Sequence, residues 1–286
     1  MRHPQPLVGQ FLSLDPVVAH AMHQDYSVWV RTGWTGDAVS EEQKISGPLH
    51  EYVRPGVALL KFSGVTVMEQ WSTWGPEIVY ATLERAIEEA FAALATAHLV
   101  VQLESPGGFC SSLLASCERI RRITSMRKIP VSVHTQGQCT SAGAILAAAI
   151  CSNKRGRITS EMAVRVGNIG MYRLLTFTRR ALEEAGIDVR YVAAGSHKVD
   201  LFPELPPDDQ AFKREQAQVE EIYEAICRAV GLYRSTALGI SPEEGYRLVR
   251  GQDSRTYIGN QEAIDNGVID AVMTLDQVLD EAADAV

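Results

Sequence analysis

The sequence predicts an α/β fold with a mostly parallel β-sheet, on two observations. Short apolar runs rich in β-branched residues alternate with longer segments whose apolar residues recur at helical spacing. Turns containing glycine separate many of these segments. Alternation of this kind is typical of βαβ units, whose strands pair in parallel. With 286 residues, 46% of them hydrophobic, the chain is long enough to bury a substantial core.

Each predicted element rests on its own pattern. The run 57–62 (VALLKF) is short and rich in residues that favour strands. A helix is predicted over 174–186, with Gly186 as its C-terminal cap. Val219, Ile222 and Ile226 fall on one face of a long amphipathic helix. In chain order the elements are strand 57–62, helix 83–94, strand 99–103, helix 113–120, strand 130–134, a small-residue helix from 142, helix 174–186, strand 189–194 and helix 208–237.

The first 54 residues differ from the rest of the chain. They mix Pro, His, Trp and charged residues without sustained periodicity, and Gly and Pro interrupt them repeatedly. We therefore expect two parts, an N-terminal extension or cap at 1–54 and the folded domain at 55–286.

The charge and composition exclude several classes of function. There are 27 basic and 35 acidic residues, so the net charge of −8 repels polyanions, and we expect no nucleic-acid partner. The five cysteines form no CxxC pair and are expected to be reduced core residues. No secretory signal or membrane-length apolar segment is visible, which predicts a cytoplasmic protein without a membrane span. No metal or nucleotide motif occurs, so no cofactor is expected.

The turns that leave parallel strands are where a site is expected. The first of interest is Ser105-Pro106-Gly107-Gly108, which follows a strand and precedes a helix. Paired glycines let the backbone approach a ligand and can aim N–H donors at an anion. On this segment alone, a tight structural turn is the commoner interpretation.

The second turn of interest is residues 138–144 (QCTSAGA), which opens the small-residue helix. It half matches the nucleophile elbow G-x-S-x-G, with Cys139 in place of the first glycine. Small neighbours would let a substrate carbonyl reach the Ser141 hydroxyl, and the helix N-terminus would favour negative charge there. The structural alternative is an N-cap serine in front of a closely packed helix.

A nucleophilic serine needs a base. His134 ends a strand and could approach, although a strand-end histidine is more often structural. Among the six lysines only Lys198 lies just past a buried-looking strand, in AAGSHKVD. Burial lowers the pKa of an amine, which allows a lysine to act as a neutral base. Without the rest of the pattern, Lys198 would be read as a surface loop residue.

With these motifs assembled, the chain resembles the signal-peptide-peptidase-A type of serine peptidases, in the phage and prophage capsid-maturation branch. The resemblance covers roughly residues 56–274. Six loose motifs carry it because they occur in the right order: GVALLKFSG, LVVQLESPGG, CTSAGA, GNIGM, EEAGIDVRYVAAGSHKVD and GNQEAIDNGVIDAV.

The resemblance implies a layered Clp-protease-like or crotonase-like fold and a Ser-Lys dyad. Ser141 matches the family's nucleophile and Lys198 its general base. Gly108, preceded by Gly107, matches the glycine whose N–H helps to form the oxyanion hole, and Ala142 N–H is the expected second donor. In residues 167–170 (GNIG), Asn168 replaces the serine that commonly orients the lysine, and an amide oxygen can accept the same hydrogen bond.

These motifs predict a serine endopeptidase that acts through an acyl-enzyme on a peptide or protein, expected to be a capsid or scaffold protein. The family assembles into rings, so a homo-oligomer is expected, with 208–237 as a candidate contact. Three alternatives stay open: a catalytically impaired capsid or scaffold-interaction protein, a peptidase that degrades signal peptides, and a crotonase-like acyl-CoA enzyme. A Clp-type Ser-His-Asp peptidase is disfavoured because no histidine follows Ser141 at a suitable distance.

Overall fold

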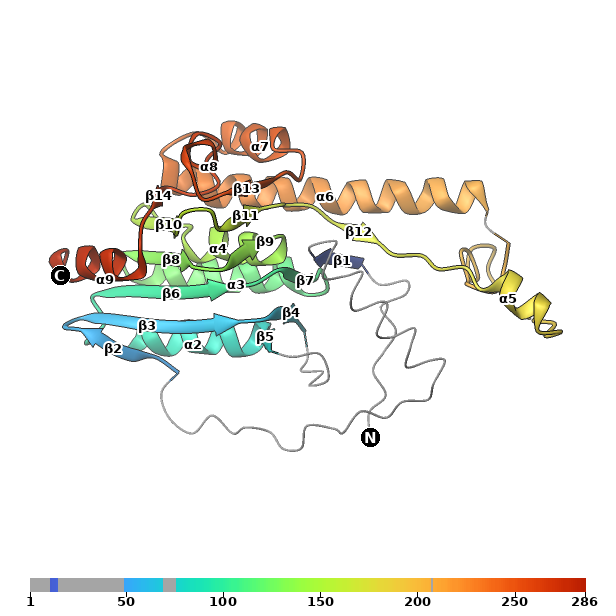
Figure 1. Cartoon of the computed structure of the whole chain (residues 1–286), viewed down its shortest axis with the longest axis horizontal. Helices are drawn as coiled ribbons and strands as arrows, with labels where there is room; N and C mark the ends of the chain where they lie inside the picture. The colour runs from blue at the N-terminus through green and yellow to red at the C-terminus, as the bar shows by residue number, and fades with distance from the viewer. Residues whose placement is uncertain (1–10, 15–48, 69–75, 207) are drawn as a thin grey trace.

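The computed structural model describes residues 11–14, 49–68, 76–206 and 208–286 (Figure 1). The strands in these parts are β1 (Phe11–Leu14), β2 (Glu51–Arg54), β3 (Val57–Ser63), β4 (Val65–Val67), β5 (Glu77–Val79), β6 (His98–Glu104), β7 (Gly107–Phe109), β8 (Val131–Thr135), β9 (Gln138–Thr140), β10 (Gly156–Ser160), β11 (Arg165–Gly167), β12 (Tyr172–Arg173), β13 (Thr256–Ile258) and β14 (Ala271–Val272). The helices are α2 (Tyr80–Ala92), α3 (Leu113–Met126), α4 (Ala142–Ile150), α5 (Arg179–Glu184), α6 (Asp209–Leu238), α7 (Pro242–Gly251), α8 (Gln261–Asp265) and α9 (Leu275–Asp284).

The predicted mostly parallel sheet is confirmed. A sheet of six strands runs in the order β14-β10-β8-β6-β3-β2, and only the edge strand β2 pairs antiparallel. Two smaller sheets, in the orders β12-β1-β7-β4-β5 and β13-β11-β9, complete the strand pairing of the described residues. The chain therefore has the α/β architecture that the strand and helix alternation predicts.

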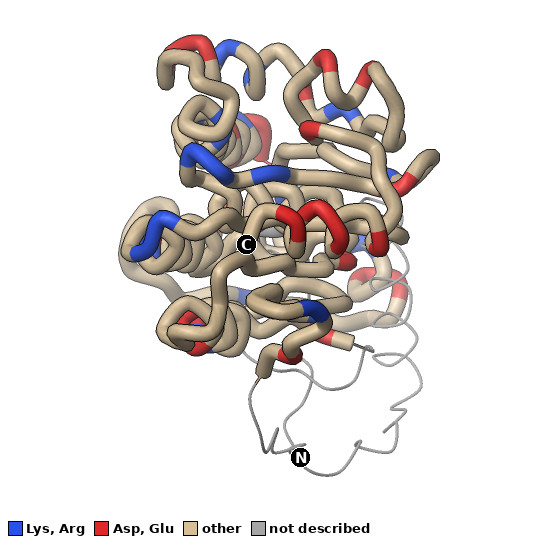
Figure 2. The backbone as a smooth tube through the Cα atoms, turned by 90° about the vertical axis from the view of Figure 1, so that its left-hand side faces the viewer, with Lys and Arg blue, Asp and Glu red and all other residues tan. Residues whose placement is uncertain are grey.

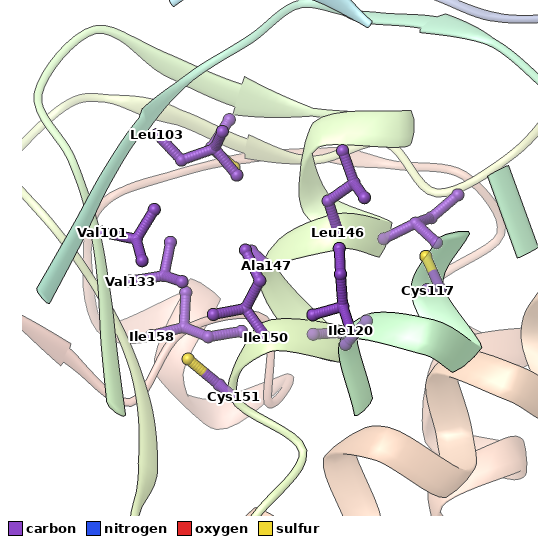
Figure 3. Packing of buried hydrophobic residues seen from close by; sticks show 14 of the residues in the cluster. Val101, Leu103, Cys117, Ile120, Val133, Leu146, Ala147, Ile150, Cys151 and Ile158 are labelled. Atoms are coloured by element: carbon purple, nitrogen blue, oxygen red, sulfur yellow. The ribbon is translucent and has the colours of Figure 1, made fainter. Parts of the chain in front are cut away.

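Both faces of the large sheet are buried, which explains why its strands read as continuous apolar runs. In β3, Ala58 and Leu60 point into the main core, whereas Val57 and Leu59 pack against α9 on the other face. Figure 3 shows strand residues Val101 and Val133 beside Ala147 and Ile150 of α4, with Leu146 on the side of α4 that faces α3. The helix α4 consists of small and branched residues because it is buried in the middle of this core.

The ends of neighbouring strands position the two turns predicted to be functional. Strands β6 and β8 are parallel neighbours, so their carboxyl ends lie on the same side of the sheet. The chain leaves β6 through Ser105 and Pro106 into β7, and leaves β8 through Gln136 and Gly137 into β9 and α4. The sheet topology thus brings together two turns that are well separated in sequence.

The structure differs from two predictions in a projecting arm, residues 174–206. The helix predicted over 174–186 is present only as α5, and the strand predicted over 189–194 has no regular structure. Gly186 does close α5, with φ of +72°. The segment 189–194 has the residues of a strand, but it runs along the arm with an exposed Val192 and pairs with no strand edge among the described residues (Figure 1). Residues that favour strands do not form one where no neighbouring strand is available for pairing.

The long helix and the C-terminal helix close the fold. The helix α6 spans Asp209–Leu238, in agreement with the predicted 208–237, and Asp208 caps it by accepting from the N–H groups of Gln210 and Ala211. The acidic face of α9, visible in Figure 2, pairs with basic residues of the large sheet: Glu281 with Arg157 at 2.5 Å. In the described parts of the chain, no helix combines the length and apolarity needed to cross a membrane.

The predicted extension lies mostly outside the described residues, which omit 1–10 and 15–48. Two short strands within it are described. Strand β2 pairs with β3 at the edge of the large sheet, and β1 pairs with β7 and β12 in the five-stranded sheet. The division at residue 54 stays a prediction.

Candidate active site

Backbone hydrogen bonds join the two turns that the sequence singles out. Ser105 N–H donates to the Gln138 carbonyl at 2.6 Å, and Thr140 N–H donates to the Ser105 carbonyl at 2.9 Å. The turn that carries Gly107 and Gly108 is therefore fixed against the residues that precede Ser141.

Ser141 has an uncommon backbone conformation. It is buried, immediately precedes α4 and has φ of +56° and ψ of −123°. Few residues other than glycine adopt a positive φ, which costs on the order of 1–3 kcal/mol, and such strain is concentrated at functional sites. Its N–H donates to the Gly167 carbonyl at 2.8 Å, so the main chain of the 167–170 segment holds the serine in this position. The geometry is that of a sharp strand-to-helix turn, as the elbow motif predicts.

Two glycines are needed because backbones approach closely around Ser141. A Cβ on Gly143 would lie 2.9 Å from the Ser105 Cβ, so the first turn of α4 can pack on the glycine turn only without a side chain there. A Cβ on Gly108 would lie 1.9 Å from the Thr66 carbonyl oxygen of β4. The turn that leads from Ser105 to Gly107 and Gly108 therefore packs against the first turn of α4, which Ser141 and Ala142 begin. The N-terminus of α4 carries partial positive charge and favours an anion.

Glu104 is a site-shaping residue that the sequence reasoning did not assign. Its carboxylate accepts from the N–H groups of Gln136, Gly137 and Gln138 at 2.7, 2.8 and 3.0 Å. The Thr135 hydroxyl donates to it at 3.0 Å. One side chain therefore fixes the whole turn that leads to Ser141. Its place at the end of β6, beside the glycine turn, is the signal that could have identified it.

Asn168 lies next to the residue that holds Ser141. It has φ of +55°, its N–H donates to the Arg255 carbonyl at 2.8 Å, and its Nδ2 donates to the Ser254 carbonyl at 2.8 Å. The amide group is thereby oriented through its nitrogen. Ser254 and Arg255 lie far away in sequence, so no local pattern predicts this contact.

Lys198 is not brought together with Ser141 within this chain. It is exposed in an irregular turn of the arm, rather than at the end of a strand as predicted. Asp200 holds that turn to α6 by an ion pair with Arg214 at 2.5 Å. Arg214 precedes Tyr223, a core residue of α6, by about 14 Å of helix rise. Figure 1 shows the arm extending away from the layers that contain α4.

Two other groups near Ser141 fit structural roles. His134 is fully buried, its Nδ1 lies 2.9 Å from the Thr159 hydroxyl, and burial lowers its pKa. Burial also raises the pKa of the Cys139 thiol well above its usual value, which disfavours a thiolate. The buried neutral His134 and the protonated Cys139 thiol are therefore poor nucleophiles. Of these three groups, the geometry favours Ser141 as the nucleophile.

The close approach at Gly143 gives a testable prediction. Gly143→Ala is expected to lower the rate of peptide hydrolysis by about 10- to 100-fold, because the new Cβ displaces the Ser105 turn and with it the proposed oxyanion donors. Gly251→Ala is the matched control, since no atom lies within 4 Å of the Cβ position at the end of α7. Equal rates for the two variants would contradict a role for this packing in the site.

Comparison with known proteins identifies the family. The chain is 25% identical over 239 residues to Capsid assembly protease C of Escherichia phage lambda, a match covering 82% of this chain and 50% of that protein. It is 24% identical over 234 residues to Head-tail preconnector protein GP5 of Enterobacteria phage P21, covering 80% and 43%. The chain therefore spans about half the length of these relatives.

Among solved structures, a mutant of ClpP1 from Listeria monocytogenes aligns with a TM-score of 0.41 at 16% identity, covering 76% of this chain and 92% of that chain. The profile of Peptidase family S49 matches residues 124–286, a range that includes Ser141, Asn168 and Lys198. This match covers more than half of the chain, and the chain belongs to peptidase family S49.

Proposed function

We propose that this chain is a serine endopeptidase in which Ser141 is the nucleophile and Lys198 the general base. The observation that carries the proposal is the position of Ser141, which has a positive φ at the N-terminus of α4, where Gly143 packs against Ser105 at the start of the turn that leads to Gly107 and Gly108. Family membership supports peptidase chemistry of this kind.

The proposed reaction is acyl transfer. Lys198 in its neutral form accepts the Ser141 proton, and the serine oxygen attacks the carbonyl carbon of the scissile peptide bond. The N–H groups of Gly108 and Ala142 donate to the oxyanion, a contribution of about 3 kcal/mol for one such donor. The protonated lysine then donates to the leaving amine, and water hydrolyses the acyl-enzyme to regenerate the serine. Asn168 is proposed to orient the lysine through its side-chain oxygen.

We further propose that the dyad forms between two copies of the chain. Lys198 lies on the projecting arm, where it is exposed, whereas Ser141 is buried beside α4 in the body. Apolar side chains on the same arm, including Ile187 and Val192, are also exposed and would be covered in such a contact. A repeated arm-to-body contact of this kind is heterologous and closes into a ring if its rotation permits.

The proposed substrate is a protein of a phage head, either capsid or scaffold. The names of the two phage relatives, a capsid assembly protease and a head-tail preconnector protein, support this choice. A catalytically impaired protein is the second candidate, and Asn168 favours it because an amide stands where the resembled family commonly has the serine that orients the lysine. Labelling of the serine distinguishes the two.

A serine-directed fluorophosphonate probe tests the proposal. The full chain is expected to acquire one covalent label, and peptide mapping is expected to place it on Ser141. Labelling should become slow in Lys198→Ala, because the base that removes the serine proton is missing. An unlabelled wild-type protein that also fails to cleave a co-expressed capsid or scaffold protein would support the impaired candidate instead.

A further inference from the structure

Strand β1 pairs with the part of the site where the oxyanion donors are proposed. In the five-stranded sheet it lies between β7 and β12 and is antiparallel to both (Figure 1). Ser13 is opposite Gly108 and Leu14 is opposite Gly107. On the other side, Leu12 is opposite Tyr172 and Phe11 is opposite Arg173. A segment from the N-terminal part of the chain therefore runs alongside β7, the strand that contains Gly107 and Gly108.

The slot that β1 fills has two strand edges. Strand β7 follows the turn that packs against α4, and β12 follows the 167–170 segment that holds Ser141. In the described residues, β12 is joined to the sheet through β1. An extended peptide placed between these edges would form main-chain hydrogen bonds on both sides, which is how strand addition binds peptides of varied sequence.

We propose that residues 11–14 occupy, within the same chain, the place of the substrate strand, and that a substrate must displace them before Ser141 can act on it. This inference rests on the proposed peptidase function. It assigns the substrate as an extended segment that runs antiparallel to β7, and it makes the N-terminal segment an inhibitor of its own chain.

The pairing is short enough to be displaced. Strand β1 has four residues, three of them opposite β7 and two opposite β12. A typical hydrogen bond contributes only about 1 kcal/mol net, so a few ladder bonds do not make the strand permanent. Its advantage is the covalent link, since a tethered segment has an effective concentration of order millimolar. Peptides that bind weakly therefore do not displace β1. Segments that bind tightly, or that are present at high concentration, do displace it.

Ser13→Pro in the full-length chain tests the pairing without removing any residue. Proline has no N–H to donate to a ladder and disfavours a strand between two neighbours, whereas Ser13→Ala keeps the main chain intact and is the matched control. Amide hydrogen exchange is measured with Ser141→Ala present in both, so that self-cleavage cannot interfere. Exchange at β7 is expected to accelerate in the proline variant only. Unchanged exchange at Val100 and Val101 of β6 would show that the fold is preserved.

Adding the segment in trans completes the test. A synthetic peptide of residues 9–15 (GQFLSLD) is expected to restore protection at β7 in the proline variant, and a scrambled peptide is not. With Ser141 present, Ser13→Pro is expected to lower KM for a peptide substrate at least about fivefold with little change in kcat, because a competitor has been removed.

Three results would overturn the inference: identical β7 exchange in the proline and alanine variants, an unchanged KM, or an intact mass showing that Ser141 cuts the chain within residues 11–14. The last result would make the segment a substrate instead of an inhibitor. Absence of any fluorophosphonate labelling would count against the proposed peptidase function alone, because the exchange measurement does not require activity.

Discussion

Ser141→Ala is expected to lower kcat for peptide hydrolysis by at least about 10⁴-fold, with folding preserved. The substitution removes the atom that forms the acyl-enzyme, and in serine peptidases the loss of the nucleophile removes most of the rate enhancement that the catalytic groups provide. The measurement is steady-state hydrolysis of a substrate cleaved by the wild-type chain, with fluorophosphonate labelling in parallel.

Ser112→Ala is the matched control for this prediction. Ser112 also precedes a helix, α3, with φ of +66°, but it is exposed and lies outside the turn that meets α4. A change from serine to alanine at a positive φ is therefore common to both variants, and only Ser141→Ala should abolish activity. Comparable activity of the two variants, or labelling that persists in Ser141→Ala, would exclude Ser141 as the nucleophile.

The second large effect concerns complementation between two inactive variants. Ser141→Ala and Lys198→Ala are each expected to be inactive alone, whereas their co-expression in equal amounts should restore up to about a quarter of wild-type activity. If each site takes its serine from one copy and its lysine from the next, a random mixture places both wild-type residues at about one site in four. Measurement requires purified mixed assemblies and the same peptide substrate.

A lysine elsewhere in the arm region provides the control for complementation. Lys213, on the exposed face of α6, is one residue from Arg214, which pairs with Asp200 of the Lys198 turn. Lys213→Ala should remain active alone, because it is outside the proposed dyad. Mixed assemblies that contain both dyad variants and stay inactive would place Lys198 in the same chain as its serine or exclude it as the base. Full activity of Lys198→Ala alone would exclude it directly.

Local patterns were sufficient for the central strands and helices of the fold. Strands such as β3 and β6 are buried on both faces over most of their length, so each contains a short apolar run, VALL in β3 and LVV in β6. The helix α6 was predicted to within one residue at each end, because its apolar face and its Asp208 cap are both local features. The arm was predicted poorly for the opposite reason: residues 189–194 have strand-forming side chains, but whether they pair depends on a distant edge.

By itself the sequence determined the α/β class, the main strands and helices between residues 57 and 150, the long helix α6 and the serine and glycine turns, since each depends on residues close together in the chain. The tertiary structure decided what surrounds them. Glu104 fixes the turn before Ser141, Gly167 holds the serine N–H, and Ser254 orients Asn168, all across gaps in sequence that no periodicity spans. The exposure of Lys198 and the pairing of β1 with β7 beside Gly108 were also found only in the tertiary structure. Hydrogen bonds between distant segments depend on which strands lie side by side in the sheets. Short-range residue patterns do not contain that information.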